Sequence, residues 1–402
     1  MKIKSLIIFL LTGLLCTCID PYNIEFRKSE TLLVVDALLT DEENSYYVSL
    51  SRTNAIQSED PSMVTGASVS ISEINGISVI LQESSPGIYK TDSLTFKGRI
   101  GNSYTLSIVT PEGNAYESEA CLMYPVDQIE RIYYDKDQEI QNNGTEIRNG
   151  IRIFIDSETT GGSSFVRWIY NESWKILVPD PKKYDYLNDS TIIEAPVKHI
   201  CWGNNTSDEI IIQSTAAGSE NKIEKESILF IDSENSNRFL IRYSIEVKQL
   251  SLSQKEFGFW DQMRQINNAG GDIFDKQPFP VTGNIRNINN PDEPVLGYFQ
   301  VSAVNRKRIY INRDEIAKLE IPVYMYECSR IVLGPDDYPP PLVPGGGMSF
   351  DKIYRMYSGP VYSFIEPIYD QTGELKKLVF SKNECADCTK TGDLSKPYFW
   401  TD

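Results

Sequence analysis

The chain has 402 residues, of which 41% are hydrophobic and 24% charged, and its formal net charge at pH 7 is −17. The apolar content, which includes 23 Tyr and 16 Phe, is sufficient for folded cores, and the length is typical of two or three domains. The acidic balance argues against nucleic acid as a partner, because DNA and RNA are held by basic surfaces.

The amino terminus has the organisation of a bacterial lipoprotein signal. Residues 1–15 read MKIKSLIIFLLTGLL, in which two lysines precede an apolar run too short to span a bilayer as a mature helix. In the segment LLCTCIDPYN that follows, Cys18 has Leu15 at position −3 and Thr17 at −1, the spacing of a cysteine that receives diacylglycerol. Cys16 fits less well, because Leu15 would then occupy a position that favours a small residue.

Cleavage before Cys18 would define the mature protein. We predict a signal peptide over residues 1–17 and a lipidated tether over 18–30, held to the membrane by acyl chains such as palmitate. Each buried methylene contributes about 0.8 kcal/mol, so that several chains together make detachment negligible. Removal of residues 1–17 takes away two lysines and lowers the net charge to −19. An ordinary cleaved signal is the alternative.

Short strands separated by turn signals begin near residue 31. In GASVSISEING (66–76), Val69 and Ile71 alternate with serines, as in a half-buried antiparallel strand. Residues 102–120 read as a strand, a turn and a returning strand. Repeated short strands at this spacing predict an immunoglobulin-like β-sandwich over residues 31–122.

The remainder, residues 123–402, has the same β texture and is predicted to form a larger β domain. Alternating or apolar runs at 150–158, 164–177 and 238–253 indicate strands. The stretch between residues 179 and 196 is rich in Tyr, Asn and Asp and is interpreted as a long loop. The fold class expected from the whole chain is therefore all-β.

One packed α-helix is predicted at about 253–269. Ser253 and Glu256 have the spacing of a capping box, in which each side chain satisfies the other residue's backbone amide. Trp260 should be the main anchor of this helix on a sheet. We interpret its apolar stripe as core rather than as a ligand cleft; the stripe consists of Phe257, Trp260, Met263 and Ile266.

The cysteines predict structural disulfides. The pair Cys385-Ala-Asp-Cys388 has a spacing that can bind zinc, carry redox chemistry or close a bridge. No second pair of this kind supplies further zinc ligands, and the segment does not read as a helix start behind a strand. In an oxidising compartment disulfides are the default. We therefore expect bridges among Cys201, Cys328, Cys385 and Cys388, with three connectivities open, and an unpaired Cys121.

The sequence offers little for catalysis. His199 is the only histidine, which excludes HExxH zinc sites and leaves a nucleophile–histidine–acid triad possible only through this residue. No GxSxG elbow, Walker loop or dinucleotide-binding glycine motif is present. We therefore expect no catalytic residues, no cofactor and no metal site, although carboxylate pairs of the glycoside hydrolase kind cannot be recognised from sequence.

The run NRKRIYINR (305–313) concentrates positive charge in an acidic protein. Alternation around Ile309 and Ile311 predicts a strand with a basic outer face. This face could meet a negatively charged surface, or it could pair with the protein's own acids, which we favour.

Four stretches carry a resemblance to a known family: residues 384–400, 242–260, 271–311 and ICW at 200–202. They resemble Bacteroidota outer-membrane lipoproteins of undefined function, commonly encoded beside TonB-dependent receptors. The resemblance implies an outer-membrane location, exposure at the cell surface and a TonB-dependent receptor as partner. It supplies no catalytic residues.

Three functions follow as hypotheses. The leading one is a surface-exposed, non-catalytic accessory subunit that binds a ligand for a TonB-dependent transporter or caps that transporter. The alternative is a structural or adhesive cell-surface lipoprotein. The third is a surface hydrolase with an acid pair in a cleft. The chemistry of the ligand is not readable from the sequence.

Overall fold

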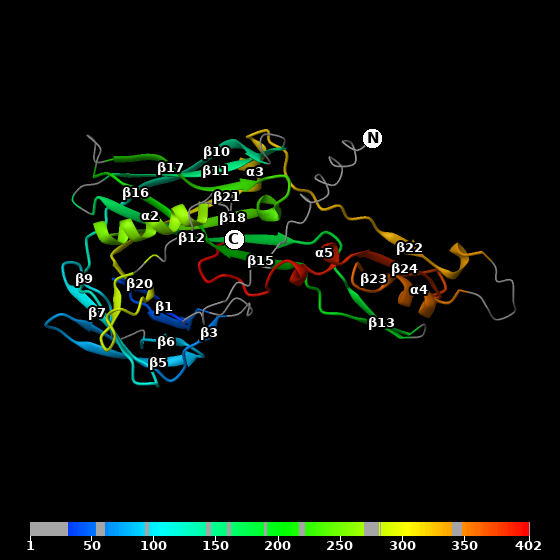
Figure 1. Ribbon diagram of the computed structural model, residues 1–402. Helices are drawn as coiled ribbons and strands as arrows, with labels where there is room; N and C mark the ends of the chain where they lie inside the picture. Colours follow the sequence, from blue (N-terminus) through cyan, green and yellow to red (C-terminus); the bar gives the residue numbers. More distant parts are fainter. Residues whose placement is uncertain are drawn as a thin grey trace, which may run out of the picture.

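The computed structural model describes residues 31–53, 61–92, 96–141, 146–158, 161, 163–188, 191–216, 222–268, 281, 283–339 and 348–401. Within them the chain is mostly strand, so the prediction of an all-β fold is confirmed. The signal peptide 1–17, the tether 18–30 and Cys18 lie outside the described residues. In the described part, no helix has the length and apolar character needed to cross a membrane. Figure 1 shows an amino-terminal module, a central module and a carboxy-terminal arm.

An eleven-stranded sheet forms the amino-terminal module. The first half of strand β5 pairs with β4, and its second half pairs with β6. The strands on both sides of β5 contribute side chains to one core. Val69 and Ile71 are buried in this core, in agreement with the alternation of the sequence. The strands from the first part of the chain are β1 (Leu33–Thr40), β2 (Tyr47–Arg52), β3 (Ser62–Met63), β4 (Ser68–Glu73), β5 (Ser78–Ser85), β6 (Ile88–Lys90), β7 (Ser103–Val109), β8 (Ala115–Ser118) and β9 (Cys121–Leu122).

Two strands from far along the chain complete this module. β20 (Leu296–Ser302) pairs in parallel with β1, and β19 (Ile285–Asn287) pairs antiparallel with β8. The expected boundaries 31–122 therefore leave out β19 and β20, the two edge strands of this sheet. Periodicity in a sequence identifies strands but does not identify the strands with which they pair. The immunoglobulin-like arrangement stays a prediction.

Gly297 allows β20 to approach β1 closely. Its φ is +89°, a conformation that residues with a side chain rarely adopt, and a Cβ at this position would lie 1.9 Å from the carbonyl oxygen of Val35. Glycine is therefore required for this pairing.

The central module consists of two antiparallel sheets that share one core. One has five strands, in the order β15-β12-β18-β21 with β16 beside β12, and the other has the order β10-β11-β17. Trp168 and Tyr243 of the first sheet and Ile151 and Ile153 of the second are fully buried in the shared core. The strands are β10 (Ile129–Gln141), β11 (Glu146–Glu158), β12 (Phe165–Leu177), β15 (Ile200–Thr206), β16 (Ile211–Ser214), β17 (Lys222–Asp232), β18 (Arg242–Ser251) and β21 (Val304–Asn312), with short helices η3 (Asn237–Phe239) and α3 (Arg313–Ala317).

Helix α2 (Gln254–Asn268) begins with the predicted capping box. The Ser253 amide donates to Glu256 Oε2 at 2.6 Å, and the Glu256 amide donates to Ser253 Oγ at 3.2 Å. Trp260 is only partly buried, so its expected role as main anchor is wrong. Phe259 is the buried aromatic residue of the helix, and its ring lies 4.7 Å from that of Tyr298 on β20. Helical periodicity defines a face, but the element opposite decides which residue is buried.

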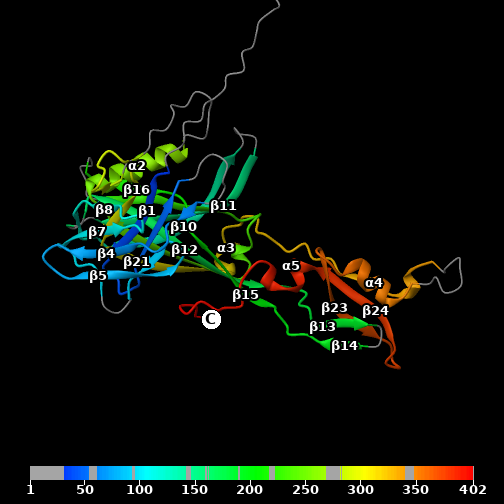
Figure 2. The same cartoon turned by 60° about the horizontal axis from the view of Figure 1, so that its bottom comes forward.

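The carboxy-terminal arm projects from the body in both views (Figures 1 and 2). Its small core includes Tyr186, Phe364 and Phe380. The stretch 179–196 contains a hairpin and is not the long loop expected. The arm contains β13 (Tyr184–Asn188), β14 (Thr191–Glu194), β22 (Ile331–Leu333), η4 (Pro335–Asp337), α4 (Phe350–Tyr357), β23 (Tyr362–Tyr369) and β24 (Leu375–Lys382), and at its base α5 (Asn383–Ala386) and η5 (Cys388–Lys390).

Two disulfides fasten the base of the arm. Cys201 of β15 bonds to Cys388, and Cys328 bonds to Cys385, while Cys121 carries a free thiol. These are the four cysteines for which the sequence predicts bridges. The two cysteines of the CxxC pair do not bond to each other, because each takes a partner from a distant segment.

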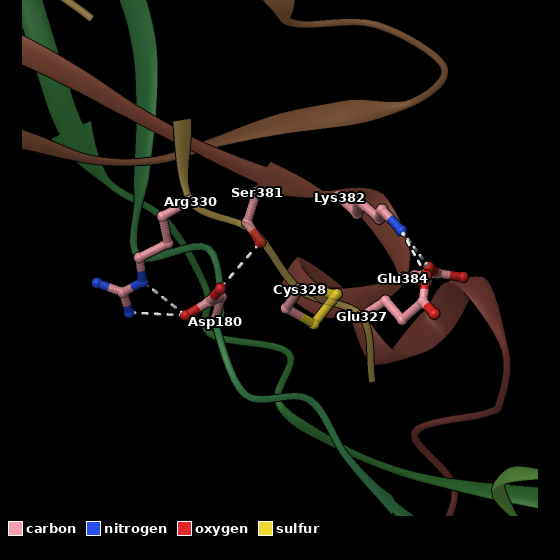
Figure 3. The surroundings of a disulfide bond; sticks show 8 residues. Asp180, Glu327, Cys328, Arg330, Ser381, Lys382 and Glu384 are labelled. Atoms are coloured by element: carbon pink, nitrogen blue, oxygen red, sulfur yellow. Dashed lines mark hydrogen bonds and ion pairs between the residues drawn. A yellow bond between two sulfur atoms is a disulfide. The ribbon is translucent and has the colours of Figure 1, made fainter. Parts of the chain in front are cut away.

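A buried carboxylate supports the same junction. Asp180 is 7% exposed and accepts hydrogen bonds from Arg330 Nε at 2.7 Å and Ser381 Oγ at 2.9 Å, as Figure 3 shows. Because a buried charge is costly unless paired, this contact helps to fix the arm to the segment that precedes β13.

Candidate functional site

A pocket of about 550 Å³ lies where the outer face of the amino-terminal sheet meets the central sheet and α2. Side chains alternate along a strand, so Val35 and Ala37 of β1 enter the module's core while their neighbours point towards the pocket. The walls include Val34, Asp36 and Leu38 from β1, Tyr298 and Gln300 from β20, Arg167 and Ile169 from β12, Lys248 and Leu250 from β18, and Phe259, Trp260 and Met263 from α2.

Arg167 is the central charged group of the pocket wall. Its guanidinium lies 3.5 Å from the centroid of the Trp260 ring, and its Nη1 donates to Gln300 Oε1 at 3.0 Å. Among the described residues no carboxylate forms an ion pair with it, and Asp36 acts on it only through longer-range Coulomb attraction. Burial lowers the pKa of Arg167 to about 10, so the group remains charged at neutral pH.

Among the residues that the structure describes, two hydrogen-bond donors in this wall have no acceptor. They are Arg167 Nε and Trp260 Nε1, and both are buried. An unsatisfied buried donor typically costs about 1–3 kcal/mol. Comparable donors occur in closed parts of the fold, for example Trp174 Nε1 in the central core, so Arg167 is distinguished by its place in a pocket wall.

A second pocket, of about 710 Å³, adjoins the first and shares Glu42, Asn44, Lys248 and Val304 with it. At the shared boundary, Lys248 Nζ lies 2.7 Å from Glu42 Oε2. The second pocket is mainly polar and charged, whereas the first is lined mostly by apolar and aromatic side chains. The two together form a cleft with chemically distinct halves.

The basic strand forms one wall of the charged half. Arg306 lies 3.5 Å from Glu42, and Arg308 lies 3.2 Å from Glu246. The prediction that this strand pairs with the protein's own acids is therefore confirmed for both residues. Their charges are largely neutralised within the chain.

The carboxy-terminal tail borders the same half. The Arg308 guanidinium lies 3.5 Å from the centroid of the Phe399 ring, and Trp400 is buried against Tyr310. These contacts position Tyr398, which is 94% exposed, at the rim. An exposed tyrosine beside a cleft offers a planar surface and a hydroxyl to a ligand.

A buried acid behind the pocket fixes α2 against β20. Glu256 is 2% exposed, and its Oε1 accepts a hydrogen bond from the Val301 amide at 3.1 Å. Burial raises the pKa of Glu256 to about 7 and that of the nearby Cys121 thiol to about 12. A thiol with such a raised pKa is a poor nucleophile, so Cys121 has a structural setting.

The structure places the sequence-predicted residues apart from this pocket. Cys201, Cys328, Cys385 and Cys388 lie at the base of the arm. His199 is partly buried just before β15, and its carbonyl oxygen accepts a bond from the Val178 amide at 3.1 Å. No cluster of three or more His, Cys, Asp or Glu suited to a metal ion occurs within the described ranges.

Sequence reasoning missed the pocket residues. Trp260 and Met263 were assigned to core, and they form pocket wall instead. Arg167 gave one weak signal, a cation among the apolar and aromatic residues at the start of β12. Its significance depends on Gln300, which is 133 residues away in the chain.

Comparison with known proteins adds the family. Residues 19–308 match a family described as Domain of unknown function (DUF4249). The chain belongs to this family. No curated protein and no solved structure matches it. The match includes every residue that lines the first pocket and ends within β21, before β22–β24 and α4 of the arm.

Proposed function

We propose that the protein is a non-catalytic, ligand-binding lipoprotein of the bacterial outer membrane that serves as an accessory subunit of a TonB-dependent transporter. The observation that carries the proposal is the pocket between the two modules, with its aromatic and aliphatic walls and with Arg167, which forms no ion pair with a carboxylate of the described residues. Concave, mainly apolar sites with few convergent polar groups are typical of small-molecule binding.

The chemistry of the pocket favours binding over catalysis. One of its carboxylates is already held by two cations: Glu42 contacts both Lys248 and Arg306. A general base must reach the proton of a nucleophile or substrate, and a carboxylate held by two cations is poorly suited to that role. We therefore place binding ahead of a surface hydrolase.

The proposed location rests on the amino-terminal sequence. A signal followed by Cys18 supports acylation, and the resemblance to Bacteroidota lipoproteins supports the outer membrane and its cell-surface face. Acids at Asp20 and Glu25 near the acylated end are in keeping with export to the surface, although they are not adjacent to the cysteine.

The arm offers surface for a protein partner. It exposes large apolar side chains, including Leu187 (61%), Met356 (61%) and Val361 (57%). Exposed apolar side chains that gather on a projecting element are a feature of contact surfaces. The same observation favours the alternative of an adhesive or structural surface protein, for which the arm would contact an external surface.

Affinity purification from solubilised outer membranes tests the proposal. The full-length tagged protein should recover a TonB-dependent receptor, and metabolic palmitate should label the unaltered chain. The Cys18→Ser variant should lose the label and leave the envelope fraction, whereas Cys121→Ser, which changes a cysteine outside the signal, should retain both.

Recovery of no receptor would count against the transporter partnership. Envelope retention of the Cys18→Ser variant would count against lipid anchoring. The adhesive alternative instead predicts a deletion strain that grows normally on every substrate and is altered in attachment.

A further inference from the structure

We propose that Arg167 is the anion-recognition residue of the inter-module pocket and that the ligand is a small organic acid, a carboxylate carried on an apolar or aromatic body. The inference deepens the ligand-binding function proposed above and rests on it. It depends on three features of the pocket: an incomplete set of partners around Arg167, apolar walls, and acids that limit the charge of the ligand.

Other arginines of this chain show how the fold completes such a stack. Arg238 lies over Trp174, with 4.7 Å from guanidinium to ring centroid, and its Nε donates to Glu172 at 2.9 Å. The same ring-and-carboxylate combination occurs at Arg131 with Tyr133 and Asp156, at Arg152 with Phe230 and Asp137, and at Arg308 with Phe399 and Glu246. Arg242 instead donates to a backbone carbonyl beside the end of the chain. Arg167, like Arg242, has the ring and no carboxylate partner among the described residues, and of these two arginines only Arg167 lines the pocket.

The missing group matches a carboxylate in shape. A guanidinium presents its N–H groups as a planar fork, and the two oxygens of a carboxylate accept from that fork together. Trp260 holds one face of the guanidinium, and Gln300 accepts from Nη1. The Gln300 amide nitrogen donates to Ser302 Oγ at 2.8 Å, which orients its oxygen towards the arginine. The arginine is therefore fixed before a ligand arrives.

The surrounding walls select an apolar body. Val34 and Leu38 lie on one side, Ile169 and Leu250 on the other, and Met263 contributes from α2. A volume of about 550 Å³ falls within the range of about 300–1,000 Å³ typical of small-molecule sites. Hydroxyl groups of a ligand that faced these apolar side chains would have no partners there, so the part of the ligand on this wall should be apolar.

The acids of the pocket disfavour a second negative charge. Asp36 acts on Arg167 by Coulomb attraction and would repel the outer oxygens of a phosphate dianion. Lys248 offers no compensation, because Glu42 already pairs with it at 2.7 Å. A single carboxylate carries one negative charge, which the one positive charge of Arg167 can balance.

Matched acid and amide probes test the inference. Binding of 3-phenylpropionate and hexanoate, and of the corresponding amides, is measured by calorimetry on the full-length protein in lipid nanodiscs. Each acid should bind at least about tenfold more tightly than its amide, since charge-assisted hydrogen bonds are roughly twice as strong as neutral ones. This ratio is measured on the unaltered chain and does not depend on the folding of any variant.

Substitutions assign the preference to one residue. Arg167→Gln should remove the acid-over-amide preference, and Arg167→Lys should retain only part of it, because lysine lacks the planar fork. Arg286→Gln changes an exposed arginine on β19 of the same module and should leave the preference intact. Thermal unfolding of each variant shows that the comparison is made between folded proteins.

The outcomes separate this inference from the proposed function. Equal binding of acid and amide, an acid preference that survives Arg167→Gln, or no binding of any probe would each overturn the inference. Recovery of the receptor is measured in parallel on the same preparations. A receptor that co-purifies while no acid binds refutes the inference alone, whereas acid binding without a receptor refutes only the transporter partnership.

Discussion

The pocket-bearing body and the carboxy-terminal arm are stabilised in different ways. In the body, β1 and β20 meet through parallel backbone pairing, and each module has an extended core. The arm has a smaller core and is joined at its base by two disulfides and the Asp180–Arg330 contact. The family match covers the pocket and not the arm's main sheet. The pocket therefore lies within the region that the family shares, and the arm's main sheet lies outside it.

Removal of a disulfide should have the largest effect, centred on the base of the arm, where Cys201 and Cys388 also pack into the edge of the central core. The Cys201–Cys388 bridge joins residues 187 positions apart, and loss of a native disulfide typically costs about 2–5 kcal/mol. For Cys388→Ser we expect protease cleavage within β22–β24 at concentrations that leave the unaltered arm intact, with unchanged binding in the pocket. Cys121→Ser is the control. Loss of pocket binding in Cys388→Ser would show that body and arm are not independent.

Gly297→Ala tests how far the body depends on the close pairing of β20 with β1. The new Cβ would lie 1.9 Å from Val35 O at a positive φ, and we expect a loss of about 2–4 kcal/mol in unfolding free energy together with weakened pocket binding. Gly101→Ala is a matched control, because its φ is +87° and nothing lies within 4 Å of the added atom. Equal destabilisation by both substitutions would mean that backbone strain, and not the approach of β20 to β1, accounts for the loss.

The acid behind the pocket should give a smaller, pH-dependent effect. The folded-state pKa of Glu256 is about 7, above its ordinary value of 4.5, so its contribution to stability is present below about pH 4.5 and is lost as the pH rises through 7. The change across this window should be at most about 3 kcal/mol, because the pKa rises from 4.5 to about 7. Glu256→Gln retains a capping side chain and should flatten the slope of unfolding free energy between pH 4.5 and 7.

Acids with lowered pKa values act in the opposite direction and at lower pH. Hydrogen bonds from Thr372 hold the pKa of Asp370 at about 2, so the stability it contributes is present above about pH 4 and is lost as the pH falls towards 2. Asp370→Asn should therefore change the unfolding curve only in strong acid. If the unfolding free energy of Glu256→Gln still changes between pH 4.5 and 7, a group other than Glu256 causes that change.

Local patterns in the sequence were sufficient for several elements, although not for the hairpin of β13 and β14. Alternation at Val69 and Ile71 identified a strand, and the spacing of Ser253 and Glu256 identified the start of α2, since both depend on neighbours a few residues away. The set of bridged cysteines followed from composition, but their pairing did not, because it depends on how Cys201 and Cys328 approach the base of the arm.

The pocket could not be predicted in this way. Arg167, Trp260 and Gln300 come from three separate segments of the chain. Within its own segment, none of them belongs to a sequence pattern that indicates a pocket. The periodicity of α2 indicated an apolar face without indicating that a cavity lay opposite part of it. Strand partners such as β1 and β20 are equally invisible to periodicity, so the walls of the pocket were assigned to different domains.

The parallel pairing of β1 with β20 also constrains the order of folding. Synthesis runs from the amino terminus, so β1 emerges long before β20, and one edge of the first sheet stays open until residue 302 has been made. An unpaired edge is a template for association with other chains. Until β20 is in place, the free edge of β1 is therefore a position at which the chain can pair wrongly with another strand.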